Sequence, residues 1–381
     1  MNYRTHIASS LSEIGQAPWD ELAGMQDKHN PFLSFAFLHA LHESGSACAA
    51  TGWQPQFIAL YDGAHLAAAM PLYLKAHSYG EYVFDWAWAD AYHRNGVEYY
   101  PKLLSAIPFT PVSGPRLLAR DAHARAALVE ALRAMQQSCA VSSAHILYPP
   151  EEQARQLAEA GYLLRSGVQF HWLNAGYRDF EQFLATLEHK KRKNIRAERR
   201  KVAAAGVTLR RVRGLDATPA DWRLFNRCYQ HTYAAHRSTP YLNLDFFERI
   251  GRSMASNILL VIAEREGRPI ASSLLVHSDD TLFGRYWGEL EHVPCLHFET
   301  AYYQPLEFCI EHKIAVFEGG AQGEHKMARG FLPTRTWSAH WLAHPAFADA
   351  VERFLEREGG GIDSYMDELN ERNPFRAAAG R

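Results

Sequence analysis

Runs of apolar residues, separated by short polar turns, predict a series of strands whose order occurs twice in the chain. The runs FIALYDG from Phe57 and VIAEREG from Val261 each end in a charged turn with glycine, which is typical of a β-hairpin. Each is followed by a second apolar strand, HLAAAMPLYLK or RPIASSLLVHS, and then by an aromatic one, YVFDWAWAD from Tyr82 or TLFGRYWGE from Thr281. The pattern therefore predicts two antiparallel units of one type.

The second half of each unit repeats as well. A helical pattern, ARAALVEALRAMQQ from Ala124 or FETAYYQPLEFCIEHK from Phe298, precedes a short apolar strand, AHILYP or IAVFEG. Each copy then ends in nearly the same strand, because GYLLRSGVQFHWL from Gly161 and GFLPTRTWSAHWL from Gly330 are identical at five of thirteen positions. The order hairpin, strand, helix, strand, strand predicts a duplicated α/β domain.

The segments outside the repeat complete the predicted domain organisation. The first copy is longer by about 35 residues, which fall in 92–118 and predict a long ordered loop of the kind that often binds ligands. The stretch 180–206 predicts a basic helix that ends at Gly206, and further helices are expected at 221–236, at 245–256 and from Ala346. We therefore expect domains at 1–175 and 207–381 with a linking helix at 176–206.

Composition narrows the class of protein without naming a substrate. Of 381 residues, 47% are apolar and 22% charged, and the net charge of -2 does not steer the whole protein toward nucleic acid or an anionic membrane. No run approaches the eighteen apolar residues of a membrane helix. The five cysteines are widely spaced without a CxxC pair, which predicts reduced thiols in a cytoplasmic protein and no metal site.

The repeated order resembles the core of the GCN5-related N-acyltransferase (GNAT) fold. Two such copies joined by a helical segment resemble the Fem-type peptidoglycan aminoacyltransferases and their FemAB-like relatives. Three stretches carry this resemblance: the basic helix HKKRKNIRAERRKV from His189, EGGAQGEHKMARGF from Glu318, and PFTPVSGPRLL from Pro108. It implies two tandem GNAT-like domains, each a mixed, mostly antiparallel sheet flanked by helices, and an enzyme that transfers an acyl or aminoacyl group to an amine.

The identity of the acyl donor stays open between two kinds of co-substrate, and no tightly bound cofactor is expected. GNAT enzymes that use acyl-CoA hold its pyrophosphate on a glycine-rich loop, but this chain has HVPCLHFET at that point, without glycine. This difference favours aminoacyl-tRNA or an unusual mode of CoA binding. The near-neutral charge and the lack of a coiled-coil arm favour a small thioester donor, which is the leading hypothesis.

The second copy offers the fullest set of candidate catalytic and binding residues. Acyl transfer to an amine needs a base that takes a proton, for which we expect Glu289 or Glu299, with His297 as substitute. It also needs donors to the developing oxyanion, often at a bulge in the central strand. The other candidates are strand residues and a glycine-rich turn with cations: Arg285, Tyr286, Trp287, Gly319, Gly320, Gln322, Lys326 and Arg329.

The expectation for residues 285–287 depends on local pattern, and that for Lys326 depends on the resemblance. Strand alternation places Tyr286 on one face and Arg285 with Trp287 on the other. The resemblance implies that Lys326 holds a phosphate of a nucleotide-linked substrate. The alternative interpretation is structural, because carboxylates at a strand end or in the first turn of a helix need no catalytic role.

In the first copy, polar residues follow the predicted aromatic strand, and they are candidates for substrate binding. They are Asp85, Tyr92, Arg94 and Asn95, with Arg116 as an anion-binding residue of the long loop. Ordinary polar residues of a loop are the alternative.

Three hypotheses about function follow. The first is an N-acyltransferase that acts on an amine of a small molecule or of a cell-wall-type precursor, with acyl-CoA or aminoacyl-tRNA as donor. The second is a non-catalytic binding protein on a duplicated acyltransferase fold. The third is a nucleic-acid binder, in which the eight Lys and Arg of 190–201 contact tRNA, although a solvated face is the commoner meaning of such a run. The sequence predicts no oligomeric state.

Overall fold

The computed structural model describes residues 3–27, 29–321 and 323–376. The chain forms two compact units, each made of two segments that are distant in the sequence. Unit 1 is Met1–Gly167 with Arg335–Ser364, and unit 2 is Val168–Thr334 with Tyr365–Arg381. The domains predicted from the sequence follow the repeat and not these contacts, so the ranges 1–175, 176–206 and 207–381 stay a prediction.

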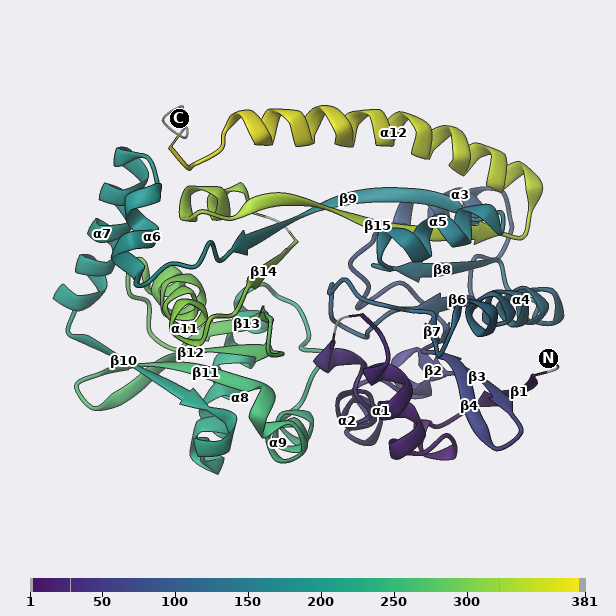
Figure 1. The fold of residues 1–381 in the computed structure, drawn as a ribbon, viewed down its shortest axis with the longest axis horizontal. Coiled ribbons are helices and arrows are strands. Elements are labelled where there is room, and N and C mark those ends of the chain that lie inside the picture. Colours follow the sequence, from purple (N-terminus) through teal and green to yellow (C-terminus); the bar gives the residue numbers. More distant parts are fainter. Residues whose placement is uncertain (1–2, 28, 322, 377–381) are drawn as a thin grey trace. The chain divides into compact units, whose positions relative to one another are not determined.

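Unit 1 contains two groups of strands, with the orders β1-β3-β4-β7 and β8-β6-β5-β2 (Figure 1). All neighbours are antiparallel except β6 and β8, which are parallel. The strands are β1 (Arg4–Ala8), β2 (Trp53–Pro55), β3 (Phe57–Asp62), β4 (His65–Met70), β5 (Tyr73–Lys75), β6 (Lys102–Ser105), β7 (Leu118–Ala119) and β8 (Ser143–Leu147). The helices are α1 (Gln16–Gly24), α2 (Phe35–Glu43), α3 (Trp86–Arg94), α4 (Ala122–Ser138) and α5 (Glu151–Glu159).

Helix α4 shows why these residues form these elements. The Asp121 side chain accepts a hydrogen bond from the Ala124 backbone N–H, which caps the helix. Its apolar stripe, with Leu128 and Leu132, packs into a core that includes Ile146 of β8. Helix α4 therefore connects the parallel strands β6 and β8, as a crossover between parallel strands requires.

Unit 2 repeats this plan, with the strand order β10-β11-β12-β13-β14-β9. Only β13 and β14 are parallel. The strands are β9 (Leu163–Leu173), β10 (Val207–Arg213), β11 (Ile258–Arg265), β12 (Arg268–His277), β13 (Thr281–Glu289) and β14 (Val316–Ala321). The helices are α6 (Phe180–Thr186), α7 (His189–Ala204), α8 (Pro219–Ala235), α9 (Leu244–Ser253), α10 (Leu296–Phe298) and α11 (Gln304–His312), with a π-helical segment at Glu299–Tyr303.

The final strand of each copy, β9 in the first and β15 (Leu332–Leu342) in the second, pairs with a strand of the other copy. The second half of β9 pairs with β14 in unit 2, where His171 faces Glu318. The second half of β15 pairs with β8 in unit 1, where His340 faces His145. Since β8 and β14 are equivalent in the repeat, each copy ends in a strand that completes the unit of the other. The chain also passes from unit 1 to unit 2 within α12 (Pro345–Glu371).

Most predicted elements are confirmed, but the third strand of the first copy is wrong. The aromatic strand predicted at 82–90 does not form. Its second half begins helix α3, in which Trp88 and Tyr92 lie four residues apart and are both buried. This spacing suits one face of a helix. The position of the third strand is taken by β6, which lies inside the segment 92–118 that was predicted to be a loop.

The linking segment 180–206 is also not one helix. Leu187 adopts an extended conformation, which separates α6 from the basic helix α7. Gly206 has a positive φ of 74° directly after α7, as expected for the residue that ends a helix.

Candidate functional site

The site begins with an irregularity in the central strand of unit 2. Between β12 and β13 the register shifts, so that Leu274 faces Tyr286 while Leu275 faces Gly284, which leaves Arg285 as an extra residue. Such a β-bulge bends the strand and interrupts its ladder of backbone hydrogen bonds. The neighbouring parallel pair is short, because β13 and β14 pair over Thr281–Phe283 while β13 continues to Glu289.

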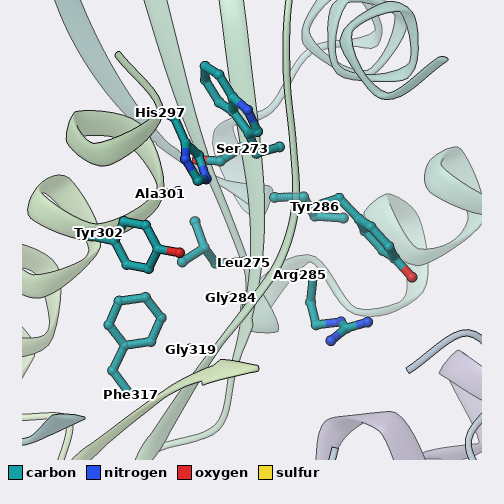
Figure 2. Close-up of a pocket in the computed structure, with 12 residues that line it drawn as sticks. Ser273, Leu275, Gly284, Arg285, Tyr286, His297, Ala301, Tyr302, Phe317 and Gly319 are labelled. Carbon is teal, nitrogen blue, oxygen red and sulfur yellow. The ribbon is translucent and has the colours of Figure 1, made fainter. Parts of the chain in front are cut away.

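A cavity of about 100 Å³ lies at this bulge. It is lined by Ser273, Leu274, Leu275, Gly284, Arg285, Tyr286, Trp287, His297, Ala301, Tyr302, Phe317 and Gly319. Figure 2 shows the rings of His297, Tyr302 and Phe317 on one side of Leu275, and the side chains of Arg285 and Tyr286 on the other. Arg285, Tyr286 and Trp287 all contribute to the lining, but the Tyr286 ring packs on Tyr229, 5.2 Å away between centroids, while the Trp287 ring packs on His297. These two side chains therefore lie on opposite faces of β13, as strand alternation predicts, whereas Arg285, the extra residue of the bulge, lies on the side of Tyr286 (Figure 2).

His297 contributes the titratable group of the cavity that is suited to accept a proton. Its ring lies 5.1 Å from the ring of Trp287 and 5.5 Å from that of Tyr302, measured between centroids. Burial, together with the positive charges of His325, Arg329 and Lys326, lowers the pKa of His297 to about 4. The imidazole is therefore neutral near pH 7, which is the form that can act as a base.

The helical segment that carries His297 has two unusual features. Cys295, which precedes α10, has a left-handed φ of 70°, a conformation that is uncommon outside glycine. Glu299–Tyr303 is π-helical, and such wide turns are frequent at functional sites. Both Ala301 and Tyr302 of this turn line the cavity, and Ser273 of β12 donates a hydrogen bond of 2.7 Å to the Thr300 carbonyl within it.

The structure places the two candidate carboxylates outside the cavity lining. Glu299 is 4% exposed, and its oxygens accept hydrogen bonds from Nε and Nη2 of Arg199 at 2.9–3.2 Å and from Gln304 at 2.9 Å. Glu289 lies at the end of β13, more exposed, with His292 Nδ1 at 2.9 Å. His297 is thus the one of the three candidate bases that lines the cavity.

The glycine-rich turn contributes one wall of the cavity and a buried lysine beside it. A Cβ atom on Gly319 would lie 3.0 Å from the Phe331 ring and 3.1 Å from the Phe170 carbonyl, so this position has little room for a side chain. Lys326 is buried, donates to the Gly320 carbonyl at 3.2 Å, and has its pKa lowered by burial to about 8. The candidate Gln322 lies outside the described residues.

Arg329 is held by its surroundings. Its guanidinium lies 3.5 Å from the centre of the Phe298 ring and donates to Glu198 at 2.8 Å and to the Tyr303 hydroxyl at 3.0 Å. Since Glu198 and Arg199 are adjacent on α7, this helix is tied by ion pairs to both the glycine-rich turn and the π-helical turn. The sequence offered no signal for these pairs, which join residues more than ninety positions apart.

Helix α7 itself is anchored on one side and charged on the other. Ile195 and Val202 are buried, as the sequence predicted. Arg196 and Arg199 pair with carboxylates of their own unit. Besides Arg196, the exposed cations of α7 are Lys190, Lys193, Arg200 and Lys201.

The candidate residues of the first copy make contacts within unit 1 and do not line this cavity. Asp85 accepts hydrogen bonds from the Lys102 ammonium and from the Tyr99 hydroxyl, the latter at 2.7 Å. Burial alone would raise the pKa of Asp85, but the charge of Lys102 and the hydrogen bonds lower it below the usual value. Tyr92 stacks on Phe347 with ring centroids 3.8 Å apart.

The remaining three candidates of unit 1 make local contacts. Arg94 pairs with Asp90 one turn earlier on α3, and the Asn95 amide donates to the Ala91 carbonyl at 2.8 Å. Arg116 is fully buried and donates to the backbone carbonyls of Val112 at 2.6 Å and Gly114 at 2.8 Å. Arg116 therefore holds the proline-rich segment together.

Sequence reasoning missed several residues that line the cavity. Leu275, Tyr302 and Phe317 read as ordinary core positions, because nothing in a single sequence reveals a bulge or a π-helical turn. Gly284, inside the strand TLFGRYWGE, is the available signal, since glycine in a strand often marks a bulge.

Comparison with known proteins agrees with the duplicated α/β fold. A family model described as FemAB-like, peptidoglycan biosynthesis or recognition, matches residues 10–377. No curated protein matches the sequence at a significant level.

Three solved structures share the fold at low identity. FemX is 11% identical, with a TM-score of 0.56 over 92% of this chain and 100% of that one. The C-terminal domain of a lysylphosphatidylglycerol synthetase from Agrobacterium fabrum is 11% identical, with a TM-score of 0.55 over 89% of this chain and 94% of that one. L-PGS from Bacillus licheniformis is 12% identical, with a TM-score of 0.53 over 88% and 96%. The predicted fold class is thereby confirmed. Among the described residues, no helix is both long and apolar enough to span a membrane.

Proposed function

The chain belongs to the FemAB-like family of peptidoglycan biosynthesis or recognition, and from this premise we propose that it is an N-acyltransferase that moves an acyl group from a thioester donor, such as acyl-CoA, to an amine. Family membership and fold support the transferase class that the sequence predicted. The acceptor would be an amine on a small molecule or on a cell-wall-type precursor.

The observation that carries this proposal is the cavity in unit 2, because it unites a bulged central strand with a neutral imidazole. The amine nitrogen would attack the thioester carbonyl carbon, forming the C–N bond, while His297 takes the proton that the amine loses. A backbone N–H at the bulge around Arg285 would donate to the carbonyl oxygen as negative charge develops on it. The C–S bond then breaks, and the thiolate leaves with the electron pair and takes up a proton.

The cations beside the cavity suit an acceptor that carries phosphate. Lys326 is buried beside the glycine-rich turn, and its pKa of about 8 leaves it mostly protonated at pH 7. A buried ammonium next to a turn of glycines can approach a phosphate closely. This is the group that the family resemblance assigns to a nucleotide-linked substrate.

Helix α7 favours a second candidate donor, aminoacyl-tRNA. Its exposed Lys190, Lys193, Arg200 and Lys201 could contact the phosphates of an acceptor stem, and each such contact makes binding weaker as salt rises. The cytoplasmic location expected from the cysteines is compatible with either donor and stays a prediction.

Turnover separates these possibilities. The purified protein is incubated with a panel of acyl-CoAs or charged tRNAs and with amines that include D-alanine, L-lysine and a nucleotide-linked muramyl pentapeptide. We expect acyl-CoA to be consumed, and His297→Ala to lower kcat by about 10²–10⁴, while His231→Ala, which removes an exposed histidine of the same unit, has no effect. Tight binding of the nucleotide-linked peptide without acylation of any amine would favour the non-catalytic hypothesis instead.

A further inference from the structure

The described lining of the cavity at the bulge contains basic groups but no acidic ones. Among the described residues that line it, none carries a carboxylate, while His297 is basic and the Arg285 side chain lies on the other side of Leu275 (Figure 2). The other lining residues are apolar or aromatic, apart from Ser273, whose hydroxyl is bound to the Thr300 carbonyl. A positively charged group in this cavity would therefore meet no opposite charge.

The carboxylates near the cavity are committed elsewhere. Glu299 is held by Arg199 and Gln304, and Glu198 accepts from Arg329 and from the Tyr303 hydroxyl. Glu318 lies between Phe317 and Gly319 on β14, and its two neighbours line the cavity while it does not. Glu289, at the end of β13, has His292 Nδ1 at 2.9 Å and does not line the cavity either. None of these four carboxylates thus belongs to the lining that an ammonium inside the cavity would contact.

The charges around the cavity also disfavour a cation inside it. His325, Arg329 and Lys326 are the neighbours whose positive charges oppose protonation of His297, after burial itself. An ammonium group beside this imidazole would experience the same repulsion, since both are cations at the same place.

The remaining lining suits the hydrocarbon part of an acyl group. The rings of Tyr302 and Phe317 and the side chain of Leu275 bound this space (Figure 2).

We propose that this cavity takes an acyl group that bears no α-ammonium, so that the donor is a simple acyl thioester and not an aminoacyl ester. This inference rests on the proposed acyltransferase function and specifies its donor. It predicts discrimination between two acyl groups of equal shape, isobutyryl and alanyl, in which a methyl group replaces the ammonium.

The experiment compares isobutyryl-CoA with alanyl-CoA, with the amine panel above as acceptors, by following the release of CoA thiol. We expect kcat/KM for isobutyryl-CoA to exceed that for alanyl-CoA at least about tenfold, which corresponds to 1.4 kcal/mol. Equal or better use of alanyl-CoA would overturn the inference while leaving an acyltransferase in place. If neither thioester acylates any amine, the proposed function itself fails, and the inference fails with it.

A charge placed in the cavity provides an independent test. Ala301→Asp introduces a carboxylate at a lining position, and Ala301→Asn adds an amide of the same shape without charge. Relative to Ala301→Asn, we expect Ala301→Asp to shift the ratio of isobutyryl to alanyl use toward alanyl by at least about tenfold. An unchanged ratio between two folded variants would contradict the electrostatic reasoning, and the comparison in the wild-type protein decides the matter if either variant fails to fold.

Discussion

Replacing Arg199 by methionine tests whether the Glu299 side chain is structural or catalytic. The Glu299 side chain is 5% exposed and that of Arg199 27%, and three contacts of 2.9–3.2 Å join them. Breaking a buried ion pair by removing one partner costs about 3–5 kcal/mol, because a buried charge is left without its counterion. Since water reaches Arg199 in part, we expect the lower end, about 3 kcal/mol. In a unit of roughly 150–250 residues this lowers Tm by about 6–12 °C.

The assay is thermal and urea unfolding of matched variants of the whole protein. Arg196→Met is the control, because Arg196 lies on the same helix and pairs with Glu181 while 45% exposed, so that about 0–1 kcal/mol is expected. Arg199 also pairs with Glu307 at 2.6 Å. In the variant Arg199→Met/Glu299→Met/Glu307→Gln, removal of all three charges is therefore expected to restore most of the stability. Equal effects of Arg199→Met and Arg196→Met would refute this reasoning. So would a Glu299→Gln variant with normal stability and a kcat lower by about 10²–10⁴, the loss expected for a general base.

Two further predictions concern the other buried charges. Lys102 is fully buried between Glu81 and Asp85, so Lys102→Met is expected to lower the free energy of unfolding in urea by about 3–5 kcal/mol. Replacing both carboxylates by amides in this variant is expected to recover the stability, and no recovery would contradict the ion-pair account. The pKa of His297 is lowered to about 4, so its imidazole loses its proton as pH rises through about 4. We therefore expect kcat/KM to decrease below about pH 4. A decrease that already begins near pH 6.5 would contradict His297 as the base in this environment.

The same His297 shift has a consequence for stability. Because the pKa of the folded state lies below the ordinary value of 6.5, the folded protein binds fewer protons than the unfolded chain between these two values. The contribution of His297 to stability is therefore fully present above pH 6.5 and is lost as pH falls toward 4.

The repeat made much of the fold predictable from the sequence. Hairpins with glycine turns, the helix in each copy and the similar final strands follow from local pattern, and α8, α9 and α12 lie close to their predicted positions. Which partner a strand takes does not follow from local pattern. The exchange of the last strands between the units is decided by contacts between segments that are distant in the sequence.

The candidate site was less predictable, for a physical reason. His297, Gly319 and the residues around Arg285 were recognised from the strand and the turn that carry them. The role of Glu299 could not be foreseen, since its partner Arg199 lies one hundred positions earlier. In the first copy, Asp85 and Arg116 look like binding residues in sequence, but ion pairs and backbone hydrogen bonds bury both. Polar residues in a sequence reveal chemistry only once their partners are known.

Acyl transfer itself is the most direct test of the account. The protein is incubated with ¹³C-labelled acyl-CoA and the amine panel, and the acceptors are examined by mass spectrometry, in the wild type and in His297→Ala. The account predicts one amine whose mass increases by one labelled acyl group in the wild type, and a much slower increase in the variant. An unlabelled panel, or equal labelling by both proteins, would contradict acyl transfer at this cavity.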